Sequence, residues 1–150
     1  MKPYEHRGAR RIVPARLQHE VKAALESANI GGEATPSRNS ILAELCNERG
    51  WSNQTKLSPD ANISITSRKG EIGLCLQTGN MGRFYADLLK LEYLFNKQLI
   101  RAAIYLIPAK PLALEWGQNI ANFDRFTKEL GIFSSIIKTP ILVFPIRSPV

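Results

Sequence analysis

The chain has 150 residues, of which 44% are hydrophobic and 22% are charged. This composition is typical of one soluble globular domain and excludes a disordered chain. It also excludes a membrane-spanning protein, because the longest apolar runs are far shorter than the roughly 20 residues that cross a bilayer. The net charge of +7 favours a polyanionic partner such as nucleic acid.

The cysteine content favours a reduced, cytoplasmic protein. The two cysteines, Cys46 and Cys75, lie in neither a CxxC motif nor a Cys/His cluster, and the chain opens with MKPYEHRGARR rather than a signal-like apolar segment. The pattern therefore predicts neither a disulfide framework nor a structural zinc site.

Residues 1–13 are predicted to form a basic, flexible arm, and residues 14–150 a single domain. The arm is rich in arginine and is interrupted by Pro3 and Gly8, and chain termini of this kind are often poorly ordered. It can be read as a phosphate-binding segment or as a solvated tail. Its candidate DNA contacts are Arg7, Arg10 and Arg11.

Two helices are predicted next in chain order. Apolar residues recur at three- and four-residue spacing from Leu17 to Ala28, before Gly31 and Gly32 end the first helix. The second helix is expected to begin with a cap near Ser37 or Asn39 and to end near Gly50. Its predicted inner face is formed by Ile41, Leu42, Leu45 and Cys46.

Residues 62–77 alternate between polar and apolar side chains on both sides of the segment Ser67–Gly70. This period of two predicts a β-hairpin that turns at residues 67–70. Because successive side chains point to opposite faces of a strand, the hairpin has one apolar face and one polar face. The predicted polar face carries Asn62, Ser64, Thr66, Glu71, Gly73, Cys75 and Gln77.

The remaining elements complete the predicted fold class. The pattern predicts a helix over residues 82–97, a buried strand over 102–107, a helix over 117–130 and a buried strand over 141–146. The order α, α, β, β, α, β, α, β predicts an α/β fold, with a mixed central sheet flanked by helices on both faces.

One segment resembles a known enzyme family. The run Gln77, Thr78, Gly79, Asn80, followed by RFYADLLK at residues 83–90, is similar to the BglII/BstYI group of type II restriction endonucleases, in the PD-(D/E)XK nuclease superfamily. The resemblance covers about residues 40–146. It implies a restriction-endonuclease-like core, double-stranded DNA as partner, a homodimer, and Mg²⁺-dependent hydrolysis of phosphodiesters. It also makes Arg68, Lys69, Asn80 and Arg83 candidate DNA contacts.

The acidic residues that the resemblance leads one to expect are absent. The family carries a glutamate two positions before the glutamine, where this chain has Cys75, and an aspartate on the first strand, where it has Ser64 or Thr66. Magnesium prefers carboxylate oxygens. A thiol is a poor ligand for it.

Three interpretations remain open at this point. In the first, the protein binds DNA but has lost cleavage. In the second, the metal site has moved to Glu71 and Asp60, with Gln77 beside them and Lys90 near the phosphate. In the third, the scaffold serves as a protein-interaction subunit. Simpler roles compete with these. Cys75 can be a buried hydrophobe, and Asp87 can form a surface pair with Lys90.

Overall fold

The computed structural model describes residues 2–149. Its centre is a five-stranded sheet with the strand order β1-β7-β6-β5-β4, and β2 and β3 form a separate two-stranded sheet. Strands β5, β6 and β7 are parallel, whereas β1 and β4 run antiparallel to their neighbours, so the sheet is mixed. The strands are β1 (Tyr4–His6), β2 (Thr55–Lys56), β3 (Ser64–Ile65), β4 (Ser67–Lys69), β5 (Ile72–Leu76), β6 (Ala102–Pro108) and β7 (Ile141–Ile146).

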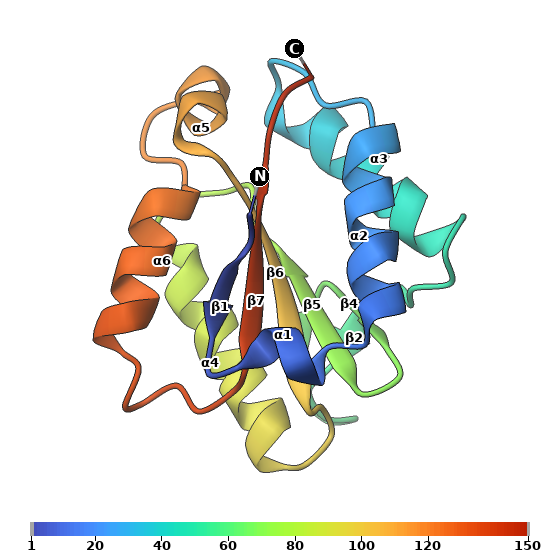
Figure 1. The fold of residues 1–150 in the computed structure, drawn as a ribbon, viewed down its shortest axis with the longest axis vertical. Coiled ribbons are helices and arrows are strands. Elements are labelled where there is room, and N and C mark those ends of the chain that lie inside the picture. The colour runs from blue at the N-terminus through green and yellow to red at the C-terminus, as the bar shows by residue number, and fades with distance from the viewer. Residues whose placement is uncertain (1, 150) are drawn as a thin grey trace.

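Helices cover both faces of the sheet, as predicted. Figure 1 shows α2 and α3 on one side and α4 and α6 on the other. Every residue of β6 is buried, because a central parallel strand is covered on both faces. No helix within residues 2–149 has the length and apolar character needed to cross a bilayer. The helices are α1 (Ala9–Ile12), α2 (Ala15–Ser27), α3 (Ala34–Cys46), α4 (Arg83–Asn96), α5 (Lys110–Trp116) and α6 (Phe123–Ile132).

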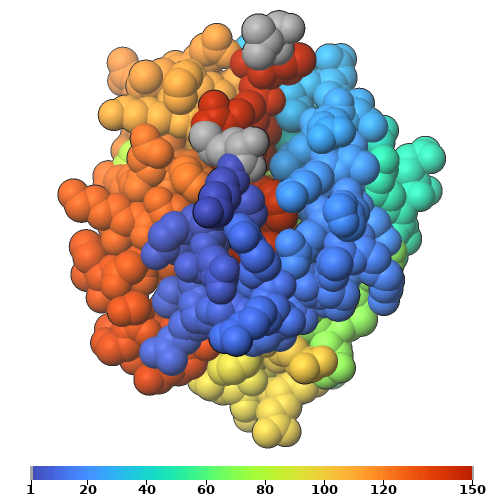
Figure 2. Space-filling view, in the orientation of Figure 1, coloured from blue at the N-terminus to red at the C-terminus, as the bar shows by residue number. Residues whose placement is uncertain are grey.

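The N-terminal segment is folded, and the prediction of a flexible arm is wrong for its described residues. Strand β1 pairs antiparallel with β7, with Glu5 opposite Leu142. Ala9 is fully buried and Val13 nearly so. Figure 2 shows the segment, in blue, packed across one face of the molecule. Its apolar residues are held in the core and its arginines remain outside, so the basic composition did not indicate disorder. Met1 lies outside the described residues.

Buried His6 should make the protein less stable in acid. Its Nε2 donates to the carbonyl of Ile137 at 2.8 Å. Burial lowers the pKa of His6 below 6.5, and Arg7 lowers it further, while the bond to Ile137 opposes the shift. The unfolded chain therefore binds the proton more readily, so the stability contribution of neutral His6 is complete above pH 6.5 and is lost as the pH falls through the folded-state pKa. We expect urea unfolding to show a smaller acid-induced loss of stability in His6→Gln than in the wild type; equal losses would contradict this.

Most helices and strands agree with the sequence pattern, with differences at their ends. α2, α4, β6 and β7 form where predicted. α3 begins at Ala34, before both predicted caps, and Ser37 instead donates within the helix to the carbonyl of Glu33. α6 begins only at Phe123, because the side chain of Asn122 caps it by accepting from Arg125 N. The short helix α5 was not predicted.

The hairpin has a different register from the one predicted. Its turn is Gly70–Glu71, since Lys69 pairs with Ile72, and Gly70 has the positive φ of 60° that two-residue hairpin turns favour. Ser67 to Lys69, predicted as the turn, are strand β4. The predicted first arm contributes Ser64 and Ile65 to the separate sheet with β2.

Candidate functional site

A groove with a volume of about 1010 Å³ lies where β5 ends, between α3 and the first half of α4. Leu76, the last residue of the parallel strand β5, lines it, and such strand ends are common ligand sites in α/β folds. The charged residues that line it are Arg38, Arg83, Asp87 and Lys90, and Gln77, Ser64 and Thr66 are among its polar residues.

Gln77 is held in one orientation by main-chain and side-chain contacts. Its backbone N–H donates to Leu106 O at 2.9 Å, and its Oε1 accepts from Gly79 N at 2.9 Å. A Cβ atom at Gly79 would lie 3.1 Å from that Oε1 and 3.2 Å from Arg83 Cδ. The glycine therefore permits the close approach that fixes the glutamine amide.

Asp87 lies at the centre of the polar contacts in the groove. Its Oδ2 accepts from Gln77 Nε2 at 2.7 Å and from the hydroxyl of Tyr105 at 2.6 Å. Lys90 Nζ lies 4.0 Å from Oδ1. Burial raises the pKa of Asp87, and the hydrogen bonds from Tyr105 and Gln77 oppose this shift. Tyr105 itself is fully buried and its ring is stacked on Phe126, with 4.1 Å between centroids.

The groove is cationic overall. Arg38, on α3, donates from Nη1 to the carbonyl of Leu76 at 2.8 Å. Burial lowers the pKa of this guanidinium and the charge of Asp87 raises it, but an arginine stays protonated in either case. Arg83 and Lys90 lie on α4, so positive charge reaches the groove from both of its helices.

Of the two positions of the missing acids, the one on the first strand lines the groove, whereas Cys75 is buried beneath it. Continuing the pairing of Ser67 with Leu74 by one residue places Thr66, not Ser64, opposite Cys75. Thr66 Oγ1 accepts from Leu76 N at 3.0 Å. Cys75 is 2% exposed, and its thiol pKa is raised well above its usual value by burial and by the charge of Asp87. Cys75 is therefore a protonated, buried thiol and not part of the polar hairpin face that was predicted to carry it.

Two predicted metal ligands lie away from the groove. Glu71 is an exposed residue of the β4–β5 turn, at the opposite end of β5 from Gln77. The two Cα atoms are six residue steps apart along an extended strand, roughly 20 Å. Asp60 is exposed in the loop between β2 and β3. Of the predicted catalytic set, the structure brings together Gln77 and Lys90, around Asp87, and leaves Glu71 out.

Most of the predicted DNA contacts are also outside the groove. Arg7 donates to the carbonyl of Ser134, and Arg10 lies 3.9 Å from the carboxylate of Glu5. Arg11 is an exposed residue of α1. Arg83 alone of the predicted contacts lines the groove. Arg68 donates to the carbonyls of Gly70 and Leu99, Lys69 pairs with Glu20 at 2.8 Å, and Asn80 bridges to Ile120 just before α4.

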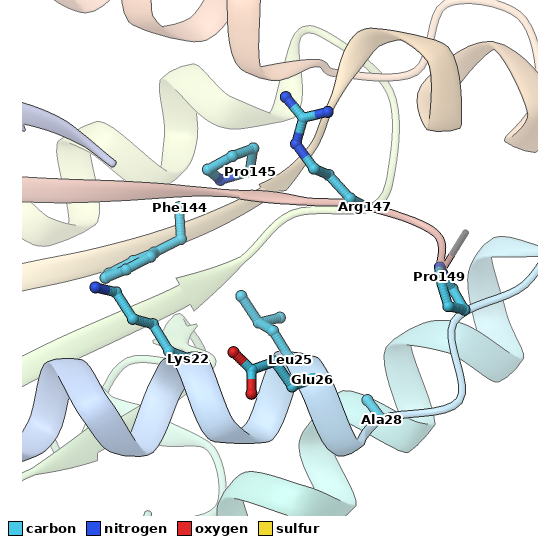
Figure 3. Close-up of a pocket in the computed structure, with 8 residues that line it drawn as sticks. All are labelled: Lys22, Leu25, Glu26, Ala28, Phe144, Pro145, Arg147 and Pro149. Carbon is cyan, nitrogen blue, oxygen red and sulfur yellow. The ribbon is translucent and has the colours of Figure 1, made fainter. Parts of the chain in front are cut away.

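A second hollow, of about 460 Å³, lies between α2 and the end of β7 (Figure 3). Lys22, Leu25 and Glu26 reach it from α2, and Phe144 reaches it from β7. None of the described residues that line this second hollow is a predicted site residue. The groove at β5 is therefore the candidate site.

The family model for the restriction endonucleases BglII and BglIII matches residues 1–146. The chain belongs to this family. Its structure is similar to that of restriction endonuclease BglII complexed with a DNA 16-mer, with a TM-score of 0.85 and 12% identity over 99% of this chain and 78% of that one. Free BglII gives a TM-score of 0.77 and 15% identity over 99% and 79% of the two chains. No curated protein matches the sequence.

The side chains of this member of the BglII/BglIII family do not fit a magnesium ion at the family's position. Cys75 is buried, and the Thr66 hydroxyl already accepts a main-chain hydrogen bond. Among the described residues that line the groove, Asp87 is the one carboxylate. Nowhere in residues 2–149 do three or more His, Cys, Asp or Glu side chains lie together so that they could hold a metal. Magnesium requires several oxygen ligands, and this donor set does not provide them.

Sequence reasoning missed Arg38 and Tyr105 as site residues, and for Asp87 it left open a surface pair with Lys90 and a catalytic role. A signal for Tyr105 was present, since it is the only hydroxyl in the strand AAIYLIP and a buried tyrosine hydroxyl usually has a partner. The parallel pairing of Cys75 with Tyr105 then places that hydroxyl near the groove. Arg38 carries no comparable signal in the helical pattern.

Proposed function

We propose that the protein binds double-stranded DNA in the groove at β5 and does not cleave it by the family's magnesium-dependent reaction. The observation that carries this proposal is the charge of the groove, which Arg38, Arg83 and Lys90 line with Asp87 as the one carboxylate among the described residues. The net charge of +7 favours the same polyanion. BglII, of similar fold, has been solved with a DNA 16-mer.

The absence of cleavage follows from the chemistry of the side chains. Phosphodiester hydrolysis in this family depends on a metal ion that neutralises developing charge and activates water. Thr66 and Cys75 supply a hydroxyl and a covered thiol where carboxylates are needed. Asp87 does not replace the pair, because it is the one carboxylate among the described lining residues and its Oδ2 already accepts two hydrogen bonds.

A salt-titrated binding measurement and a plasmid-nicking assay test this proposal together. We expect duplex binding to weaken steeply with salt, because each neutralised phosphate subtracts about 0.9 from the slope of log K against log salt. We expect no nicking over a magnesium and manganese series. Nicking that disappears in Gln77→Ala would contradict the loss of cleavage, whereas nicking that persists there indicates a contaminant. Absent binding at low salt would reject DNA as the partner.

A protein interface is a second candidate function, supported by a different surface. Leu89 on α4, Ile132 at the end of α6 and Ile136 beyond it are each more than 60% exposed, at 68%, 66% and 64%. The ring of Tyr85, on α4, contacts the ring of Phe133, just after α6, with 6.2 Å between the ring centroids. This contact places α4 beside the end of α6. Exposed apolar clusters of this kind are typical of interfaces.

The occupant we propose for this surface is a second copy of the chain, which gives the homodimer that the family resemblance implies. Sedimentation equilibrium should then give a dimer mass that Leu89→Glu converts to a monomer mass. A wild-type monomer would contradict dimerisation and would leave the surface for another protein, as in an interaction subunit.

A further inference from the structure

We infer that Arg38 and Lys90 form a phosphodiester-binding site that needs no divalent cation, at the place where relatives bind their metal. The inference rests on the proposed function, since the phosphodiester is that of bound DNA. Arg38 donates to the carbonyl of Leu76, the residue after Cys75. Lys90 lies 4.0 Å from Asp87, which accepts from Tyr105, the β6 residue paired with Cys75. Both cations therefore lie close to the residue that replaces the family's glutamate. The site thus carries permanent positive charge where the metal-binding acid is missing.

Asp87 leaves much of that positive charge uncompensated. The groove is lined by three cationic side chains and one carboxylate, a difference of +2 (3 − 1) over the described lining residues. The Oδ2 of Asp87 is bound by the neutral donors Gln77 and Tyr105. Lys90 lies 4.0 Å from Oδ1, a separation longer than that of a hydrogen-bonded ion pair. Its ammonium group therefore retains donors for a phosphate.

Arg38 is positioned to complete the site. Its hydrogen bond to Leu76 O ties it to the end of β5, next to Gln77, and uses one of the five N–H donors of the guanidinium. The remaining donors suit the bidentate recognition of a phosphate, whereas Lys90 acts as a compact charge. α3 and α4 thus supply two complementary cations to the groove.

Asp87 then has a positioning role rather than a metal-binding one. It accepts hydrogen bonds from Gln77 and Tyr105, and its Oδ1 lies 4.0 Å from the ammonium nitrogen of Lys90. This arrangement does not need a divalent cation, because the side chains of Arg38 and Lys90 neutralise the phosphate charge directly. Binding of DNA is therefore expected to be the same with and without magnesium.

Fluorescence anisotropy of a labelled duplex with the full chain tests the inference. Titrations are run in excess EDTA and in magnesium chloride, at matched ionic strength. We expect dissociation constants that agree within about twofold, and losses of roughly tenfold for Arg38→Gln and for Lys90→Gln in both buffers. Lys90→Arg should restore most of the binding. Lys128→Gln, an exposed cation of α6 outside the groove, is the control of equal charge change and should bind like the wild type.

Two outcomes would overturn the inference while leaving DNA binding in place. One is an affinity that falls at least about tenfold when EDTA replaces magnesium at matched ionic strength. The other is wild-type affinity in both Arg38→Gln and Lys90→Gln, with circular dichroism confirming that each variant is folded. A wild-type protein that binds duplex in neither buffer would instead reject the proposed function itself.

Discussion

Asp87→Ala is expected to lower the free energy of unfolding by about 2 to 3 kcal/mol, because buried hydrogen-bond donors lose their acceptor. The hydroxyl of Tyr105 is fully buried and donates to Asp87 Oδ2, as does Gln77 Nε2. With alanine at position 87, neither donor has an acceptor at that position, and each is too enclosed to be fully hydrated. Urea unfolding, followed by circular dichroism, measures the change.

A double-mutant cycle with Tyr105→Phe identifies the cause of this loss. Removing the Tyr105 hydroxyl should destabilise the wild type but should cost little, or even stabilise the protein, in the Asp87→Ala background, since its acceptor is already gone. Asp124→Ala, an exposed aspartate in the first turn of α6, is the control for loss of one carboxylate. Additive effects of the two substitutions, or a loss at Asp87 no larger than at Asp124, would contradict the assigned contacts.

Asp87→Asn is expected to strengthen DNA binding roughly two- to tenfold near neutral pH, because it removes a negative charge within a few ångströms of the phosphate while the amide oxygen still accepts hydrogen bonds. The effect should depend on pH. Burial raises the pKa of Asp87 above 3.8. As the pH falls through this raised pKa, wild-type Asp87 loses its charge and the wild-type affinity should approach that of Asp87→Asn.

Anisotropy titrations of both proteins over an acidic pH series check this prediction. Three other ionisable groups facing Asp87 do not change charge in the same range: the Arg38 guanidinium stays protonated, and burial raises the pKa values of Cys75 and Tyr105 so that both stay neutral. An unchanged or weaker affinity for Asp87→Asn at neutral pH would show that the carboxylate does not oppose phosphate binding. A difference in DNA affinity between the two proteins that stays constant as the pH falls would contradict the titration of Asp87.

The fold was predictable because its elements are long and strongly patterned. α2 and α4 show apolar residues at helical spacing. β6 is an apolar run that ends in Pro108, and β7 is one that follows Pro140, a pattern typical of strands buried on both faces. Their order alone limits the possible sheets. Residues 4–12 were mistaken for a flexible arm because β1 and α1 are short, and their burial depends on contacts with β7, far away in sequence.

The site was predictable only in part. The run that begins at Gln77 indicated the correct end of β5 and also led to Arg83 and Lys90. The hairpin register was wrong because the polar residues Ser67, Arg68 and Lys69 are typical of a turn, although Ser67 is buried and bonded to Ser52 O. That error made Glu71 the first residue of the second strand, on the same face as Cys75, whereas Glu71 lies in the turn. The contacts of Asp87 with Tyr105 join two elements of the fold, and no local pattern in the sequence reports them.

The native thiol of Cys46 offers the most direct test of the central claim, that DNA lies in the groove at β5. Cys46 lines the groove and is partly exposed, whereas Cys75 is buried. Alkylation is followed by mass spectrometry, with and without duplex, at low and at high salt. At low salt, DNA is expected to slow alkylation of Cys46 in proportion to the fraction of protein that is bound, and high salt is expected to abolish this protection. If Cys46 reacts at the rate of the free protein while anisotropy shows that the DNA is bound, the DNA does not lie in the groove at β5.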